Sequence, residues 1–327
     1  MIQEILMAEA RSFMQSRVIL TAAELDFFTC IDEKPCTASS LAHERGLDVR
    51  ATTRILDCLS AMELLAKMDD IYRVTDRGAF LSSYHAESVL PMVLHMVHLW
   101  RTWSDLTETV REGPGKQYKP GLKFSEKDWK SFVGAMHVAA RVLSIEIAED
   151  YDASQCRRLL DVGGASGTYT IAFLRKNPSM KAVIFDLEDV IPMAHERIRD
   201  EGLSDRVEFI AGDFYENELP TGCDLALLSA IIHQNSPEEN LILYSKIFRA
   251  LERGGTILIR DHIMNEDRTK PPAGALFAIN MLVNTRGGDT FSFREVKDGL
   301  ENSGFRDVKL LRTGDKMDCL VEAKKPL

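Results

Sequence analysis

Four candidate chemical residues close apolar runs that resemble buried strands. In "LLSAIIHQNSPEE", residues 227–239, the apolar run stops at His233, which we place at the exit of a strand. Three earlier strand-like runs end at Asp161, Asp186 and Asp213. The unperturbed pKa of histidine lies near neutrality, so its imidazole can accept a proton from a bound molecule. A histidine that only caps the strand and hydrogen-bonds to a neighbour is the alternative interpretation.

A glycine-rich turn follows the first of these strands in "LLDVGGASGTYT". Its glycines would let a ligand approach the backbone closely. A GxGxxG dinucleotide pattern would need glycine at Ala165 and glycine or alanine at Thr168, and no Gly-Lys-Ser/Thr follows as in a P-loop. The acidic Asp161 before the turn instead suits a ligand with a cationic amine. A glycine turn that binds no ligand is the alternative.

The next two strand ends indicate a nucleoside. Asp186 closes "VIFD", where nucleoside-binding sheets hold a ribose diol with a carboxylate. In "AGDFYEN", Asp213 could reach an adenine amino group and Phe214 could cover the ring. The carboxyl ends of parallel strands meet at one edge of a sheet, where open sheets bind ligands. Together the three aspartates favour an adenosine-bearing ligand without phosphates.

The elements that must position these residues fall into two parts. From about residue 156, strand-like runs alternate with helical ones, which predicts a mostly parallel sheet covered on both faces. Before it we expect amphipathic helices over 1–31, a helix-turn-helix and hairpin of winged-helix type to about residue 81, and longer helices over 86–110 and 125–150. We therefore predict two domains, residues 1–150 and residues 151–327.

Composition narrows the class of protein. The chain has 327 residues, of which 45% are hydrophobic and 28% charged, as in globular proteins. Its net charge of −10 would repel a polyanion such as DNA overall. Six cysteines without a CxxC pair indicate reduced thiols in a cytoplasm rather than a zinc site. We expect no signal peptide, because the N-terminus lacks a basic head followed by an apolar block, and no membrane-spanning stretch, because no apolar stretch is long enough.

One histidine pair could suggest a metal. His95 and His98 stand at i, i+3 in "VLHMVHLW", but no third ligand follows nearby. Packing or pocket lining is the favoured interpretation, and no metal is expected.

The motifs resemble those of class I S-adenosylmethionine-dependent methyltransferases. The whole chain resembles the small-molecule O-methyltransferases of the plant caffeate type and the animal acetylserotonin type. The family's DVGGGTG, FDLP and GDMF blocks match "DVGGASG" (161–167), "FDLE" (185–188) and "GDFY" (212–215). Its late strand and pocket helix match "GGTILIRDHIMNEDRTKPP" and "FAINMLVNTRGG". The resemblance implies a Rossmann-like doubly wound seven-stranded α/β sheet with an N-terminal helical winged-helix dimerisation domain.

The resemblance also implies an activity and its residues. It implies methyl transfer from S-adenosylmethionine to a hydroxyl, here an aromatic one, of a small molecule, with S-adenosylhomocysteine (SAH) as product. His233 matches the histidine that removes the acceptor proton, and Asp261 matches an acidic residue that orients it. Expected cofactor contacts are Asp161, Gly163, Gly164, Asp186, Leu187, Asp213, Phe214 and Ser229. Expected acceptor contacts are Phe132, Met136, His137, Asn280 and Met281. The expected assembly is a cytoplasmic homodimer that binds neither nucleic acid nor membrane.

Two departures from the family pattern leave alternatives open. The family's HDW is His233-Gln234-Asn235 here, and Thr290, beside Asp289, occupies the slot of a second glutamate. Methylation of carbon, sulfur or nitrogen therefore stays open, as does a protein that holds S-adenosylmethionine without turnover. A DNA-binding regulator is disfavoured, because the second winged-helix helix mixes basic and acidic residues and lacks a basic face.

Overall fold

The computed structural model describes the backbone of residues 2–114 and 126–327 and the side chains of residues 2–114 and 131–327. Its contacts divide the chain into two compact units. The N-terminal unit comprises residues 1–101 and 130–138, and the C-terminal unit comprises residues 102–129 and 139–327. Helix α8 (Glu126–Asp150) contributes residues to both units. The domain boundary between residues 150 and 151 stays a prediction.

The N-terminal unit contains a helix-turn-helix followed by a small wing. Its helices are α1 (Ile2–Glu24), α2 (Phe27–Glu33), α3 (Ala38–Arg45), α4 (Val49–Ala61), α5 (Asp76–Ala79) and most of α6 (Leu90–Ser104). Strands β1 (Cys36–Thr37), β2 (Leu65–Met68) and β3 (Ile71–Val74) pair antiparallel in the order β1-β3-β2. Thr37 and Asp48 accept hydrogen bonds from backbone N–H groups in the first turns of α3 and α4, which fixes where these helices begin.

Helix α1 exposes apolar side chains over most of its length. Side chains that are more than half exposed are Ile2, Ile5, Leu6, Phe13 and Met14. Leu20, Ala22 and Ala23, near the end of the helix, are buried instead. Monomeric soluble proteins rarely expose a contiguous apolar patch of this kind, so this face of α1 is a candidate contact surface.

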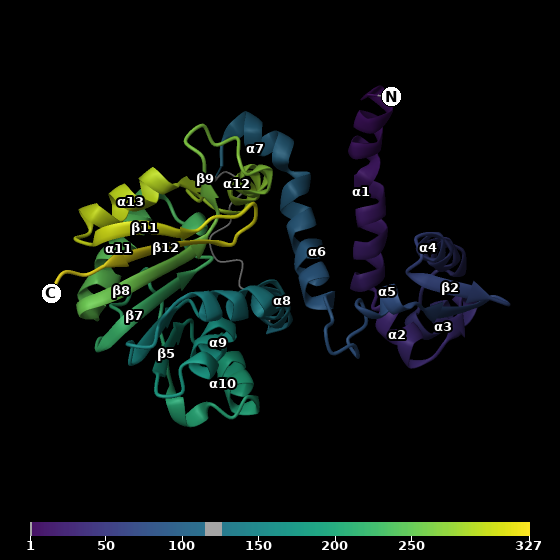
Figure 1. Ribbon diagram of the computed structural model, residues 1–327. Coiled ribbons are helices and arrows are strands. Elements are labelled where there is room, and N and C mark those ends of the chain that lie inside the picture. Colours follow the sequence, from purple (N-terminus) through teal and green to yellow (C-terminus); the bar gives the residue numbers. More distant parts are fainter. Residues whose placement is uncertain (1, 115–125) are drawn as a thin grey trace. The chain divides into compact units, whose positions relative to one another are not determined.

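The C-terminal unit is built on one seven-stranded sheet with the order β11-β12-β8-β7-β4-β5-β6 (Figure 1). The strands are β4 (Arg158–Val162), β5 (Lys181–Asp186), β6 (Val207–Ala211), β7 (Cys223–Ser229), β8 (Leu251–Asp261), β11 (Arg306–Arg312) and β12 (Cys319–Lys324). Strands β4 to β8 pair in parallel, and β12 pairs antiparallel with β8 and β11. The predicted doubly wound seven-stranded sheet is confirmed.

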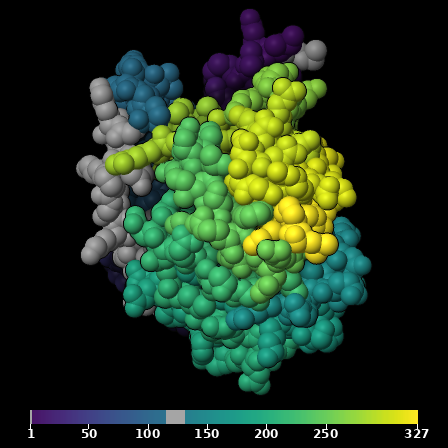
Figure 2. All heavy atoms as spheres, turned by 90° about the vertical axis from the view of Figure 1, so that its left-hand side faces the viewer, coloured from purple at the N-terminus to yellow at the C-terminus, as the bar shows by residue number. Residues whose placement is uncertain are grey.

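Helices cover both faces of this sheet (Figure 1). Helices α11 (Pro237–Ala250) and α13 (Phe293–Asn302) pack on one face, and α8, α9 (Thr168–Lys176) and α10 (Ile191–Asp200) pack on the other. The remaining elements are α7 (Leu106–Glu112), α12 (Pro272–Asn284), β9 (Ile263–Met264), β10 (Phe291–Ser292) and the short turns η1 (Ser204–Arg206) and η2 (Ile232–Gln234). In Figure 2 the yellow atoms of the C-terminal segment form one continuous area beside green atoms of the preceding elements. Strands β11 and β12, from the end of the chain, thus form one edge of the sheet of this unit.

Three strand ends differ from the sequence prediction. Strand β7 ends at Ser229, because Ala230 adopts a positive φ of 58° that an extended strand does not allow. His233 therefore lies in the turn η2, beyond the strand, rather than at its last residue. Asp161 precedes the last residue of β4, and Asp213 lies two residues beyond the end of β6. Asp186 ends β5 as predicted, and Asp261 ends β8.

One helical stretch among the described residues, 131–150 of α8, has the length and apolar composition that a membrane-spanning helix requires. The expectation that no such stretch exists is therefore wrong by length and composition. A third of the stretch is buried, and Ile147 and Ala148 belong to the core of the C-terminal unit. Core helices of globular proteins pass the same test, so this stretch is weak evidence for a membrane.

Candidate active site

The structure brings His233 and Asp261 into direct contact. Nδ1 of His233 lies 2.9 Å from each carboxylate oxygen of Asp261. Both residues are buried, with 9% of His233 and 1% of Asp261 exposed. An ionised carboxylate can only accept, so Nδ1 carries the shared hydrogen and Nε2 keeps a free lone pair. This tautomer suits an imidazole that accepts a proton at Nε2.

The surroundings keep the Asp261 carboxylate ionised. Burial raises the pKa of Asp261, but His233, the charge of Arg260 and the backbone N–H of His262 outweigh burial and hold this pKa below its ordinary value. The His262 N–H donates to Oδ1 at 2.8 Å. Phe277 of α12 packs edge-on against the His233 ring, with ring centroids 4.9 Å apart. The imidazole is thus fixed by an anion on one side and an aromatic ring on another.

The segment after α12 holds the backbone of His233. The N–H of Asp289 donates to the His233 carbonyl at 2.9 Å. Arg268 fixes this segment by donating to Asp289 Oδ2 at 2.7 Å and to the Thr290 carbonyl at 2.8 Å. The Thr290 hydroxyl donates to the Gly274 carbonyl at 3.3 Å. The Asp289 carboxylate is therefore paired with arginine, and the block that departs from the family pattern supports His233 through its backbone.

The glycine turn and Asp186 form one hydrogen-bonded unit. Gly163 has a φ of +69°, which residues with a side chain rarely adopt, and a Cβ there would lie 2.7 Å from Ile231 Cδ1, so this position favours glycine. Asp186 accepts the N–H of Ala165, at 2.7 Å, and the N–H of Leu187, also at 2.7 Å. Burial raises the pKa of Asp186 above its ordinary value, and the two backbone N–H groups oppose this shift. Each carboxylate oxygen retains a second lone pair for a ligand hydroxyl.

Asp161 lies beneath the glycine turn. Its carboxylate is 2% exposed and accepts the hydroxyl hydrogen of Thr170 at 2.7 Å. Burial raises the pKa of Asp161 to about 6. A Cβ at Gly164 would lie 2.9 Å from the Asp161 carboxyl carbon, so the turn closes directly over this side chain. That Asp161 contacts a cationic amine stays a prediction.

A buried lysine holds the segment that carries Asp213 and Phe214. Nζ of Lys246 donates to the carbonyls of Phe214, Tyr215 and Asn217 at 2.8, 2.9 and 2.8 Å. Asp213 Oδ1 accepts the N–H of Tyr215 at 2.8 Å. A Cβ at Gly163 would lie 3.8 Å from Phe214 Cε1, so the phenyl ring reaches the glycine turn. Phe214, the residue predicted to cover the adenine ring, thus lies beside the turn.

Ser229 has a partner that the sequence did not suggest. Nε of Arg260, the residue paired with Ser229 across β7 and β8, donates to its Oγ at 3.0 Å. Arg260 is 8% exposed. A lone arginine inside the apolar run "GTILIRDHI" was the signal in the sequence.

The expected acceptor residues occupy two helices. Phe132, Met136 and His137 lie on α8 within the N-terminal unit and are half-buried. Asn280 and Met281 lie on α12 in the C-terminal unit, where Met281 is buried and Asn280 Oδ1 accepts the indole N–H of Trp103 at 2.9 Å. Their contact with an acceptor stays a prediction.

Sequence reasoning also missed Lys246, His262 and Phe277. Lys246 lies three residues after the buried Leu243 and four before the buried Ala250, so helical spacing could have placed it on the buried face of α11. His262 follows Asp261 directly, and burial lowers the pKa of its imidazole. No signal in the sequence links Phe277 to His233, because the contact joins separate elements.

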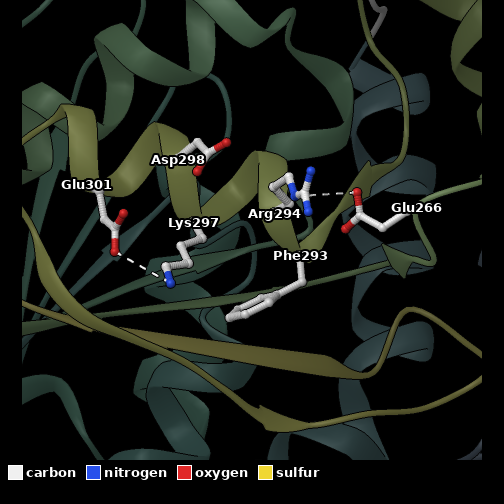
Figure 3. A pocket seen from close by; sticks show the side chains of 6 residues that line it. All are labelled: Glu266, Phe293, Arg294, Lys297, Asp298 and Glu301. Atoms are coloured by element: carbon white, nitrogen blue, oxygen red, sulfur yellow. Dashed lines mark ion pairs between the residues drawn. The ribbon is translucent and has the colours of Figure 1, made fainter.

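A shallow surface pocket on α13 is lined by residues other than those of the candidate active site. It is lined by Glu266, Phe293, Arg294, Lys297, Asp298 and Glu301, none of them a predicted site residue. Figure 3 shows Arg294 directed toward Glu266 and Lys297 toward Glu301, with N–O distances of 3.9 and 3.8 Å. These are exposed ion pairs, which fits a solvated helix face. No cluster of three or more His, Cys, Asp or Glu that could hold a metal occurs within the described residues.

Comparison with known proteins covers nearly the whole chain. A family model described as an O-methyltransferase domain matches residues 103–306, and one described as an O-methyltransferase dimerisation domain matches residues 7–83. The tetracenomycin polyketide synthesis 8-O-methyl transferase TcmO of Streptomyces glaucescens is 28% identical, over 96% of this chain and 94% of that protein. The acetylserotonin O-methyltransferase of Gallus gallus is 26% identical, over 98% and 97%.

A solved structure agrees with these sequence relatives. PigF with SAH has a TM-score of 0.89 at 25% identity, and the match covers 98% of this chain and 99% of that one. PigF is an S-adenosyl-L-methionine-dependent methyl transferase of Serratia sp.. The predicted resemblance is confirmed, and this chain belongs to the S-adenosylmethionine-dependent O-methyltransferase family, as an enzyme of that family.

Proposed function

We propose that this enzyme methylates an aromatic hydroxyl of a small molecule and that His233 is the general base. The observation that carries the proposal is the buried pair of His233 and Asp261, with Nδ1 2.9 Å from both carboxylate oxygens. The printed names of TcmO and acetylserotonin O-methyltransferase give oxygen as the methylated atom in those relatives.

The two residues divide the work of proton removal. S-adenosylmethionine supplies an electrophilic methyl group, and the acceptor hydroxyl must lose its proton as it attacks. Nε2 of His233 takes that proton, because Nδ1–H is committed to Asp261. The Asp261 carboxylate then stabilises the imidazolium that forms and keeps the ring in place. General-base assistance of this kind contributes roughly 10²–10⁴-fold to a rate.

The residues that we assign to the cofactor lie at or near the carboxyl ends of the strands, at the same edge of the sheet. Asp186 holds the ribose diol, Asp213 accepts from the adenine amino group and Phe214 covers the ring. Gly163 and the other predicted contacts, Asp161, Gly164, Leu187 and Ser229, line the rest of the ligand. The fit is supported by the glycine turn, which carries no side chains at Gly163 and Gly164 and lies beside Phe214, and by the free lone pairs of Asp186.

The remaining assignments extend the proposal to the whole chain. Phe132, Met136, His137, Asn280 and Met281 contact the acceptor. The domain of residues 1–150 forms a homodimer, supported by the match to a dimerisation domain and by the exposed apolar face of α1. The enzyme acts in the cytoplasm, without a metal, a nucleic acid or a membrane as partner, and residues 151–327 form the cofactor-binding domain.

Substitution of His233 tests the proposal. His233→Ala should lower methyl transfer to a panel of phenols by roughly 10²-fold or more. Its affinity for SAH should stay near that of the wild type, and the loss should shrink for phenols acidic enough to ionise unaided. The exposed His43 of α3 provides the control substitution, His43→Ala. Near-full activity of His233→Ala would make the histidine a structural residue. Methylation of thiols, amines or carbon acids instead of phenols would reassign the acceptor.

A further inference from the structure

Arg260 and Asp261 are neighbours in sequence but serve opposite faces of the sheet. Successive residues of a strand alternate between faces. Asp261 faces His233, whereas Arg260 shares its face with Leu258 and with Ser229 of β7, beneath helix α9. The Arg260 side chain therefore lies on the face that also carries Asp161 of β4, beside the glycine turn.

The guanidinium of Arg260 has more donors than partners. Nε donates to Ser229 Oγ at 3.0 Å, and Nη1 donates to the Met317 carbonyl at 3.0 Å. The ring of Tyr169 packs against the guanidinium, with its centroid 5.2 Å from the guanidinium carbon. Among the residues whose side chains are described, no carboxylate pairs with Arg260 and no group accepts from Nη2. The charge of Arg260 acts on the Asp261 carboxylate through space but forms no ion pair with it, so a bound anion would complete this arrangement.

Tyr169 presents a second unmet donor at the same place. Its side chain is 95% buried, since its relative exposure is 5%, and Oη meets no partner at hydrogen-bond geometry in the described part of the chain. Burial raises the pKa of Tyr169, and the charge of Arg260 and the nearby side chain of Ser229 oppose this shift. Tyr169 is the second residue of α9 and lies two positions after Gly167 of the glycine turn. Buried polar groups are nearly always hydrogen-bonded in native proteins, so a hydroxyl left without a partner indicates a missing ligand or water.

The charges at this edge of the sheet specify which ligand group fits. The carboxylates of Asp161 and Asp186 suit an ammonium and a diol but would repel a ligand carboxylate. Lys246 cannot compensate, because its three N–H donors are used by three backbone carbonyls. Arg260 has donors to spare, and a planar guanidinium matches a carboxylate in a two-point hydrogen bond.

We propose that Arg260 and Tyr169 bind the α-carboxylate of the methionine part of S-adenosylmethionine. The inference rests on the proposed cofactor site and adds an anion-binding element to it. Asp161 and Arg260 then lie at the two ends of an amino-acid zwitterion on one face of the sheet, with Ser229 between them on β7. Arg260 acts as a binding residue, not as an acid or base.

Calorimetry with matched ligands tests this inference. SAH carries the carboxylate, its α-carboxamide keeps the amine and loses the charge, and 5′-methylthioadenosine lacks both groups. Arg260→Met should lower the affinity for SAH roughly 10- to 100-fold, as expected for loss of a charge-assisted hydrogen bond. The same variant should leave the affinities for the carboxamide and for methylthioadenosine within about 2-fold of wild type. Tyr169→Phe should lower the affinity for SAH only, and by a smaller factor than Arg260→Met.

The controls separate binding from folding. Arg253→Met makes the same change at an exposed position near the amino end of β8 and should leave all three affinities unchanged. If Arg260→Met does not fold, Arg260→Lys keeps the positive charge and replaces it in the test. Arg260→Lys should retain part of the preference for SAH over its carboxamide. Equal weakening of all three ligands by the Arg260 variants, or an unchanged SAH preference in both Arg260→Lys and Tyr169→Phe, would overturn the inference. A wild-type protein that binds none of the ligands would instead overturn the proposed cofactor site.

Discussion

Asp261→Asn isolates the electrostatic part of the His233 pair. Asparagine keeps the shape of the side chain and removes its charge. The native carboxylate receives the His233 Nδ1–H, with both oxygens at 2.9 Å, and the His262 N–H at 2.8 Å. In the variant, the amide oxygen can still accept from His262, but the amide N–H then faces His233 Nδ1. The imidazole proton moves to Nε2, and the lone pair that accepts the substrate proton is lost.

The size of the effect follows from the lost interaction. A hydrogen bond to a charged group is worth about 1.5–3 kcal/mol, which corresponds to roughly 10- to 150-fold in rate. The kcat of Asp261→Asn should fall within that range, at saturating S-adenosylmethionine and phenol. The fall should be smaller than that of His233→Ala, because the amide can rotate and restore the reactive tautomer in part of the population.

The matched control is Asp289→Asn. Asp289 also belongs to the segment that supports His233, but its carboxylate pairs with Arg268 and only its backbone N–H contacts the histidine. Its substitution should change kcat by less than about 3-fold, in line with the small worth of exposed ion pairs. Wild-type kcat in Asp261→Asn, or an equal loss in both variants, would refute the assignment of Asp261 as the residue that orients the base. SAH affinity, measured in parallel, shows whether the fold survives.

Three further outcomes follow from the structure. Burial raises the pKa of Asp161 to about 6, so the folded state holds this proton more tightly than the unfolded state and stability falls as pH rises from about 4 to 6. Asp161→Asn should therefore raise the free energy of unfolding at pH 8, by at most about 3 kcal/mol, and leave it nearly unchanged at pH 4. The rise should be visible as a higher Tm at pH 8 only, and an equal effect at both pH values would contradict this. Lys246→Met should raise KM for S-adenosylmethionine roughly 10-fold at unchanged kcat, because three backbone carbonyls lose their donor. The control Lys325→Met removes the donor of one carbonyl, that of Leu251, and should leave KM unchanged. A fall in kcat alone would argue against a role of Lys246 in holding the segment that carries Phe214. Phe13→Glu should convert a dimer into a monomer, as measured by light scattering, while the same change at the somewhat more exposed Tyr84 should not. A wild-type monomer would remove the dimer from the proposal.

The sequence determined the periodic parts of this protein. Alternating strand and helix patterns predicted a mostly parallel sheet covered on both faces, because each apolar run must bury itself against a helix layer, and the family resemblance implied seven strands. The end of β5 at Asp186 could also be predicted, because the apolar run stops there, whereas Asp161 and Arg260 are charged residues inside strands. The glycine turn could also be predicted from the sequence, because a φ of +69°, as at Gly163, favours glycine over residues with a side chain. Local chemistry therefore sufficed wherever the constraint itself was local.

Only the tertiary structure decided which side chains meet. His233 and Asp261 are 28 residues apart, and their contact depends on β7 and β8 being neighbours in the sheet. The strand end before His233 was misplaced, because the positive φ of Ala230 has no signature in residue type. Arg260 looked like an isolated charge in an apolar strand until the register of β7 and β8 set it beside Ser229 and α9 set Tyr169 against it. Pairing across strands and packing across layers join residues far apart in sequence, and no local pattern encodes which residues those are.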